Sequence, residues 1–425
     1  MKKISELSRK IYNILISAII FLLPTNFFLK FNENTSYIKG LRVDYLIPKL
    51  YLTDILIIFL LLFWLFSNLK FFSLNKIKKI IFKNKLLISF LLIFFLRQLF
   101  STHSLSSILY FFKIIELSLF GLFIIKNKNK HDHKIIFSCI ALSLLFQSSI
   151  GIYQYLFQKK LFGYLLLGEP NLNNYIGIAK TTWFGIEKIL PYGTTAHPNV
   201  LGGFLSFYIL GLLNLWKLKL KNIISANKNL IFTTAMIILV ALICLILTNS
   251  ITAIATLLIG IYLTFIPKKI TLKKAINIFF CSILISIFSI KFLAQIYPEN
   301  QSFNRRDYLN TAAIEMTKNN LIIGVGLNNF TANIESYASK NETIRFVQPV
   351  HNIFLLFLTE NGLLSLVILI VLAKKYRFLQ KTKNQNWIWL LLLIPIANLD
   401  HYLMTINAGM IITTIFLSIL IKKTN

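Results

Sequence analysis

Long apolar segments separated by short lysine clusters run through this sequence, and they limit what it can fold into. Each segment is close to the ~20 residues that a helix needs to cross a bilayer. The chain is 56% hydrophobic and contains 38 Phe, far more apolar surface than a soluble core requires. We therefore predict an all-α integral membrane protein with many transmembrane helices.

Hydropathy places about twelve spans along the chain. They lie near 11–31, 50–69, 85–100, 105–125, 135–157, 198–216, 230–248, 251–266, 276–294, 351–373, 386–399 and 404–421. The first span follows Lys2, Lys3, Arg9 and Lys10, as in a signal peptide. Because no small-residue cleavage site follows, we expect an uncleaved span.

The net charge of +30 is distributed as lysine clusters between the spans. With the N-terminus in the cytoplasm, every alternate loop is lysine-rich, as the positive-inside rule requires. These clusters begin at Lys76, Lys126, Lys217, Lys268, Lys374 and Lys422. We expect a multi-pass protein of the plasma membrane with both termini in the cytoplasm. Membrane lipids would surround it, and no nucleic-acid partner is expected.

This topology places both long polar intervals outside the cytoplasm. The intervals are residues 158–197 and 295–350. Such long loops are usually functional. We divide the chain into N-terminal membrane helices (1–157), helices with the first outer loop (158–294), a large extracytoplasmic loop (295–350) and C-terminal membrane helices (351–425).

The large extracytoplasmic loop collects arginines, whereas the lysines gather inside. Arg305, Arg306 and Arg345 all lie in it. A guanidinium presents a bidentate fork that suits phosphate. These residues are therefore candidates for binding a diphosphate, and contact with lipid headgroups is the alternative.

A short amphipathic helix is expected within the same loop. Asn304 can cap its start, and Asn319-Asn320 can end it. One apolar stripe is formed by Leu309, Ala312, Ala313 and Met316. Such a helix would lie on the membrane surface, with the paired arginines at its anion-binding N-terminal end.

Histidines lie at the outer ends of several expected spans. His351 opens the tenth span, and it is positioned for a general base because imidazole titrates near neutrality. An interfacial residue satisfied by water is the alternative. Asp400 and His401 lie between the last two spans, either as functional groups or as a helix-end cap. His197 precedes Pro198, which favours a helix start.

Lys113 and Glu116 lie within the fourth span, spaced to pair on one helix face. Ionisable residues inside a span are functional candidates. They would suit a transporter or lipid flippase, which is the alternative from a different class. Transporters tend to show matching halves with sites at the midplane, whereas here the polar groups gather on one face.

Motifs for metal or cofactor binding are not found. Cys139, Cys244 and Cys281 all lie within apolar runs, so neither a disulfide framework nor a metal-ligand spacing is expected. No phosphate-binding loop, serine nucleophile elbow or zinc pattern occurs. Gly324 and Gly326 form a lone G-x-G, which favours a turn. We expect no cofactor and no metal.

Three segments together resemble the O-antigen ligase/polymerase family of bacterial envelope glycan enzymes. They are GTTAHPNVLGGFL (Gly193–Leu205), RDYLNTAAIEMTKNNLIIGVGLNNF (Arg306–Phe330) and VQPVHNIFLLFLTENG (Val347–Gly362). The resemblance implies a fold of the membrane glycosyltransferase type. It also implies metal-independent transfer of a glycan from an undecaprenyl-diphosphate carrier to a glycan or lipid acceptor outside the membrane. A polymerase shares these motifs with a ligase and remains an alternative.

Roles for the candidate residues follow from this resemblance. Arg306 and Arg345 would neutralise the departing diphosphate, with Arg305 as a helper. His351 would take the proton from the acceptor hydroxyl. Either Asp400 or His401 would orient that hydroxyl, and His401 and His197 are further substrate-binding candidates.

The chain also departs from the family pattern. An arginine often stands a few residues before the G-T pair, where this chain has Leu190, Pro191 and Tyr192. Lys188 is the residue that could replace it. The tryptophan of the second motif is Asn310 here, and the proline before the G-V-G turn is absent.

Overall fold

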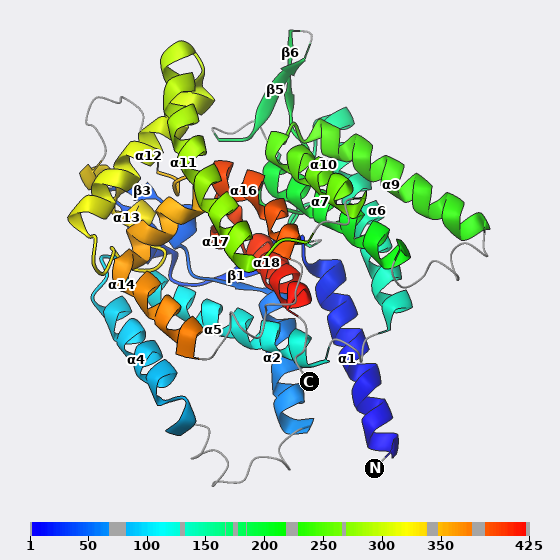
Figure 1. The fold of residues 1–425 in the computed structure, drawn as a ribbon. Coiled ribbons are helices and arrows are strands. Elements are labelled where there is room, and N and C mark those ends of the chain that lie inside the picture. The colour runs from blue at the N-terminus through cyan, green and yellow to red at the C-terminus, as the bar shows by residue number, and fades with distance from the viewer. Residues whose placement is uncertain are drawn as a thin grey trace.

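The computed structural model describes most of the chain. The described residues are 2–67, 82–127, 132–165, 167–172, 177–183, 185–217, 228–265, 269–337, 347–375 and 387–421. Arg345, one of the two arginines assigned above to the diphosphate, lies outside them. Within these residues the structure is mostly helical, with three two-stranded sheets (Figure 1).

Six of the described helices are long and apolar enough to cross a membrane. They are α5 (Ser104–Asn127), α6 (His133–Phe157), α7 (Pro198–Leu215), α9 (Lys228–Leu247), α11 (Leu272–Ile296) and α14 (Ile353–Lys375). Shorter apolar helices include α2 (Leu52–Ser67), α10 (Ile251–Phe265) and α18 (Asn407–Leu420). The remaining helices are α1 (Lys2–Leu22), α4 (Lys85–Leu99), α12 (Gln301–Asn319), α13 (Phe330–Tyr337), α16 (Ile394–Leu399) and α17 (Tyr402–Thr405). These elements support a helical membrane protein.

The first predicted span, 11–31, ends too late. Helix α1 stops at Leu22, and Pro24 follows. A proline lacks the N–H that a helix interior needs, so the helix ends before it. Residues Phe28–Lys30 (β1) instead pair antiparallel with Lys49–Tyr51 (β4).

Two of the last predicted spans are interrupted. The segment 386–399 begins as the 3-10 helix η5 (Trp387–Leu393) before α16 starts. The segment 404–421 is divided at Ile406, which has an extended backbone between α17 and α18. Asp400 and His401 lie between two of the resulting short helices, after the end of α16 and before the start of α17.

The amphipathic helix of the large loop is present as α12, but its cap was predicted wrongly. Asn300 caps it, because its side chain accepts hydrogen bonds from the N–H groups of Ser302 and Phe303. Asn304 instead donates to the carbonyl of Pro298 at 2.6 Å. The predicted end at Asn319-Asn320 is confirmed. All four residues of the predicted apolar stripe are buried.

Helix α14 is kinked at Gly362, and the G-V-G turn packs into the kink. Gly362 has φ 68°, and a Cβ there would lie 2.3 Å from the carbonyl oxygen of Ile322. A Cβ on Gly324 would lie 2.4 Å from the backbone of Glu360. Gly324 and Gly326 both have a positive φ, so the predicted turn is confirmed. Gly324 and Gly362 must be glycines because two backbones approach closely there.

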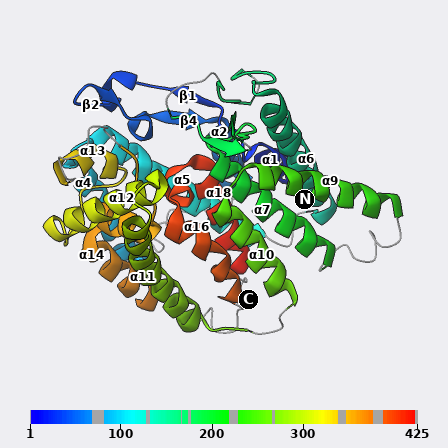
Figure 2. The same ribbon diagram turned by 90° about the horizontal axis from the view of Figure 1, so that it is seen from above.

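Among the described residues, buried apolar side chains form one large core, one small core and a minor cluster of Leu172, Ile189 and Tyr192. The large core contains residues of α1, α2, α5–α7, α9, α10 and the C-terminal helices. The small core contains residues of α12, α13 and the start of α14. In Figure 2, α11–α14 lie on one side and α6, α7, α9 and α10 on the other, with α16 and α18 between. Tyr402 packs in the large core and Met404 against the small one, so the chain after α16 joins the two.

Two further hairpins occur in the polar segments. Tyr37–Ile38 (β2) pairs with Leu41–Arg42 (β3), in the segment that follows α1. Lys180–Trp183 (β5) pairs with Ile186–Ile189 (β6), and this hairpin projects from the end of the molecule opposite the N-terminus (Figure 1).

Candidate functional site

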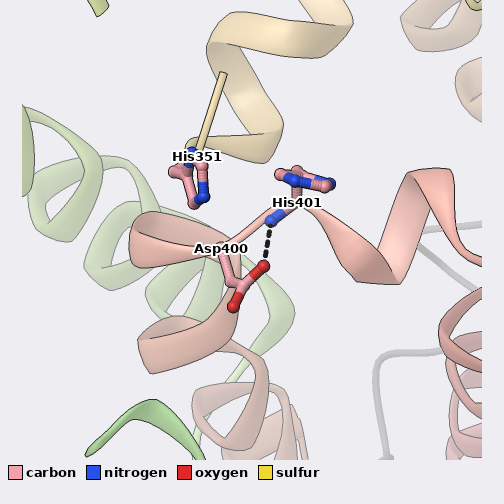
Figure 3. A group of neighbouring side chains, drawn as sticks. All are labelled: His351, Asp400 and His401. Atoms are coloured by element: carbon pink, nitrogen blue, oxygen red, sulfur yellow. Dashed lines mark hydrogen bonds between the residues drawn. The ribbon is translucent and has the colours of Figure 1, made fainter. Parts of the chain in front are cut away.

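His351, Asp400 and His401 come together where the two cores meet. Their imidazole nitrogens and a carboxylate oxygen all lie within 4.8 Å of one another. The two rings are 4.9 Å apart between centroids and nearly perpendicular. Figure 3 shows both rings above the carboxylate, to which the backbone N–H of His401 donates. The structure thus unites three residues that the sequence assigned to the site.

The position of His351 is fixed by its neighbour Asn352. The Oδ1 atom of Asn352 accepts from the N–H groups of Phe354 and Leu355, each at 3.1 Å, and so caps α14. Its Nδ2 atom donates to Ser286 of α11 at 3.4 Å. His351 therefore lies just before the helix rather than within it. The Nδ1 atom of His351 is buried and has no hydrogen-bond partner among the described residues.

Asp400 is held by hydrogen bonds from two segments. It caps the C-terminus of α16, with extended backbone. Its Oδ1 atom accepts from the N–H of His401, and its Oδ2 atom accepts from the Nδ2 atom of Asn199, both at 2.8 Å. The cap reading is confirmed, and the bond to Asn199 brings the Gly193–Leu205 motif to the cluster.

His197 begins the helix that carries Asn199. Its backbone is extended, Pro198 is the first residue of α7, and its Nδ1 atom accepts from the N–H of Asn199 at 3.1 Å. The predicted helix start is confirmed. His197 also lies close enough to Asp400 for that carboxylate to affect its pKa.

A glycine contact sets the distance between α7 and the His401 segment. A Cβ on Gly203 would lie 2.0 Å from the hydroxyl oxygen of Tyr402. A Cβ on Gly409 would lie 2.2 Å from the carbonyl oxygen of Tyr402. Only glycine allows Tyr402 to lie between α7 and α18, which positions the two residues before it.

Of the three candidate arginines, the structure brings Arg306 to the cluster. Arg306 donates to Ser302 one turn earlier, while its Nε atom is buried without a partner among the described residues. It interacts electrostatically with Asp400 and His351. Arg305 lies on the exposed face of α12 and donates to Gln301 at 3.3 Å. Lys188 lies on β6 with its ammonium over the ring of Tyr155, at 5.2 Å.

The histidines of the cluster are kept neutral. Burial lowers the pKa of His351 well below its usual value, and electrostatic interactions with His401, Arg306 and His197 lower it further. Burial also lowers the pKa of His401 to about 4, despite the opposing effect of Asp400. Both imidazoles are therefore unprotonated near neutral pH and can accept a proton.

The cluster has the composition of a metal site, but the oxygens of Asp400 and one nitrogen of His401 are already engaged. Three ligands around a zinc ion stand about 3.4 Å apart, given bonds near 2.1 Å. Both oxygens of Asp400 already accept hydrogen bonds, and His401 Nδ1 lies 2.6 Å from Thr405 Oγ1. The neighbouring guanidinium of Arg306 would also repel a cation. These contacts favour binding of a hydroxyl group over binding of a metal.

Lys113 and Glu116 do form an ion pair, at 3.4 Å, but a third residue completes it. Lys113 also bonds to Asp54, at the start of α2. Asp54 was not among the residues predicted from the sequence, although an acidic residue in an apolar run was a visible signal. It also missed Asn199, which stands within the quoted Gly193–Leu205 motif.

The chain is similar to a known protein family. A family model described as O-antigen ligase matches residues 200–370. That range contains most of α7, all of α12 and His351, whereas Asp400 and His401 lie beyond it. No curated protein matches the chain.

Proposed function

We propose that the chain is a membrane glycosyltransferase, because the match over residues 200–370 supports its assignment to the O-antigen ligase/polymerase family. It transfers a glycan from an undecaprenyl-diphosphate carrier to a saccharide or lipid acceptor at the outer face of the plasma membrane. The observation that carries this proposal is the gathering of a neutral histidine, a carboxylate and a half-buried arginine in one place.

In the proposed reaction the acceptor hydroxyl lies beside His351. The imidazole takes the hydroxyl proton as the acceptor oxygen forms a bond to C1 of the donor sugar. The bond between C1 and the carrier phosphate breaks, and the diphosphate leaves with the electron pair. Asp400, already fixed by Asn199, orients the hydroxyl or the protonated ring.

The departing diphosphate carries the charge that the site must stabilise. Arg306 lies at the cluster with a buried Nε–H that has no partner among the described residues. Such a donor is available to a phosphate oxygen, and hydrogen bonds to ionised groups are about twice as strong as neutral ones. An anion bound here would also offset the positive charges that lower the pKa of His351. Donor binding would thereby make the base stronger.

The test is the comparison of two His351 variants. General bases contribute about 10²–10⁴-fold, so His351→Ala should lose most transfer of labelled glycan per unit of inserted protein. His351→Gln should fare little better, because an amide cannot accept a proton at neutral pH. Near-normal turnover by His351→Gln would remove the base assignment.

Three alternatives can be distinguished from this proposal. A polymerase would use the same site, but its acceptor would be a glycan still attached to the lipid carrier. Its product would therefore remain linked to that carrier. A metal-dependent reaction would be lost on chelation with EDTA, whereas the proposed one persists. A transporter finds less support, because Lys113 is neutralised by Asp54 and Glu116.

A further inference from the structure

The segment that follows α1 reaches the cluster through Tyr45. This residue lies in the 3-10 helix η2 (Asp44–Leu46). Its ring lies 5.5 Å from that of His401 between centroids, at an interplanar angle of 77°. The family match covers residues 200–370, so it says nothing of this segment. His401 thus contacts Tyr45 as well as His351.

Tyr45 is held in place by its backbone and neighbours. Its carbonyl oxygen accepts from Asn328 Nδ2 at 2.8 Å, and the same amide donates to Ser106 of α5 at 2.7 Å. Leu46 is fully buried, and Asp44 pairs with Lys49 at 2.7 Å. The position of the ring therefore does not depend on its hydroxyl group.

That hydroxyl group is free to bind a ligand. Among the described residues it has no hydrogen-bond partner, and it is not closed off from solvent, whereas a buried tyrosine hydroxyl usually finds a partner. Burial raises the pKa of Tyr45, and the carboxylates of Asp44 and Asp400 raise it further. The phenol therefore stays neutral and offers an O–H donor beside Asp400.

We propose that Tyr45 forms an acceptor subsite, in which its hydroxyl donates a hydrogen bond to an oxygen of the acceptor saccharide. The assignment to the acceptor rests on the proposed function and on placement. Tyr45 contacts His401 and lies near Asp400, the groups assigned to the acceptor hydroxyl.

A kinetic experiment separates this role from a structural one. Tyr45→Phe keeps the ring against His401 and removes the O–H. A neutral hydrogen bond corresponds to about 2–10-fold, so the KM for the acceptor should rise by that factor. The kcat, the KM for the lipid-linked donor and the protein level should stay unchanged. The matched control is Tyr37→Phe, half exposed in the same segment. An unchanged acceptor KM, or an equal rise in the control, overturns the proposal.

A crosslinking experiment gives an answer that does not require turnover. A photoreactive p-benzoylphenylalanine replaces Tyr45 or Tyr37 in a chain that also carries His351→Gln. After irradiation of native membranes, the expected result is a carbohydrate-staining adduct at position 45 and none at 37. Absence of that adduct, or equal adducts at both positions, overturns the subsite. An adduct at position 45 together with full transfer by His351→Gln would instead retain the subsite and overturn the proposed base.

Discussion

The imidazoles of His351 and His401 face each other at 4.9 Å between centroids, although the whole of α14 lies between them in sequence. One ring precedes α14 and the other follows α16. Burial keeps both neutral, and each ring contacts the other edge to face. A proton accepted by one ring therefore arrives beside the other ring and Asp400, which can stabilise the charge.

Replacement of Arg306 tests the diphosphate role. Arg306→Lys keeps the charge but loses the planar fork and the Nε–H. Hydrogen bonds to charged groups correspond to about 10–100-fold, so transfer should fall by that factor at unchanged protein level. Arg305→Lys is the matched control, because the neighbouring side chain lies on the exposed face of α12. Equal transfer by both variants and the wild type would favour a headgroup role for Arg306.

The acid limb of the pH profile reports the protonation of His351. Its pKa is lowered, first by burial and then by neighbouring positive charges. With both substrates well below their KM values, the transfer rate reports the free enzyme, so it should stay level as pH falls through about 6.5, the ordinary histidine value. It should drop only at lower pH. A limb centred at or above 6.5 would contradict the buried environment described for this ring.

The stability of the folded protein should also decrease as pH falls, because burial lowers the pKa of His401. A lowered pKa means that His401 is protonated in the unfolded chain before it is protonated in the folded one. The stability from the neutral ring is complete above about pH 6.5 and is lost as pH falls towards the folded pKa of about 4. Thermal unfolding in detergent should show a midpoint that decreases across this window. His401→Gln should decrease less steeply, and an identical slope would argue against burial of the ring.

Gly203→Ala should disturb the site from a distance. The new methyl group would overlap the Tyr402 hydroxyl, 2.0 Å away, and overpacking of this kind costs about 1–3 kcal/mol. The free energy of unfolding and transfer should both fall, because Tyr402 follows His401 directly. Gly211→Ala, in the same helix, is the control, since its nearest atom is 3.7 Å away. Equal effects of the two variants would show that helix propensity, not the Tyr402 contact, is responsible.

Lys113→Met should destabilise the fold by leaving two buried carboxylates unpaired. The side chains of Asp54 and Glu116 are 6% and 14% exposed. Removing one partner of a buried ion pair costs about 3–5 kcal/mol. Adding Asp54→Asn and Glu116→Gln should recover most of the thermal midpoint. Lys318→Met breaks an exposed pair and should cost less than about 1 kcal/mol. A comparable loss in both lysine variants would contradict a buried network.

Local pattern was enough to predict several elements of the structure. Pro198 begins α7 as expected, because a proline fits the first turn of a helix. The stripe from Leu309 to Met316 is buried because its spacing matches the helical period. The ion pair of Lys113 and Glu116 needs only one turn of helix. In each case the residues that interact are neighbours along the chain.

The arrangement of the site was decided by the tertiary structure. Helix packing brings together three pairs of residues that are far apart in the sequence, so no helical or strand spacing predicts their contact. The pairs are Asn199 and Asp400, Tyr45 and His401, and Asp54 and Lys113. The sequence by itself determined a helical membrane chain and named His351, Asp400 and Arg306 as candidates. Which of these residues meet depended on Gly203, where the missing side chain leaves room for the Tyr402 ring, and on Gly324 and Gly362, where two distant backbones approach each other. Such contacts depend on the packing of whole helices, so residue spacing alone does not reveal them.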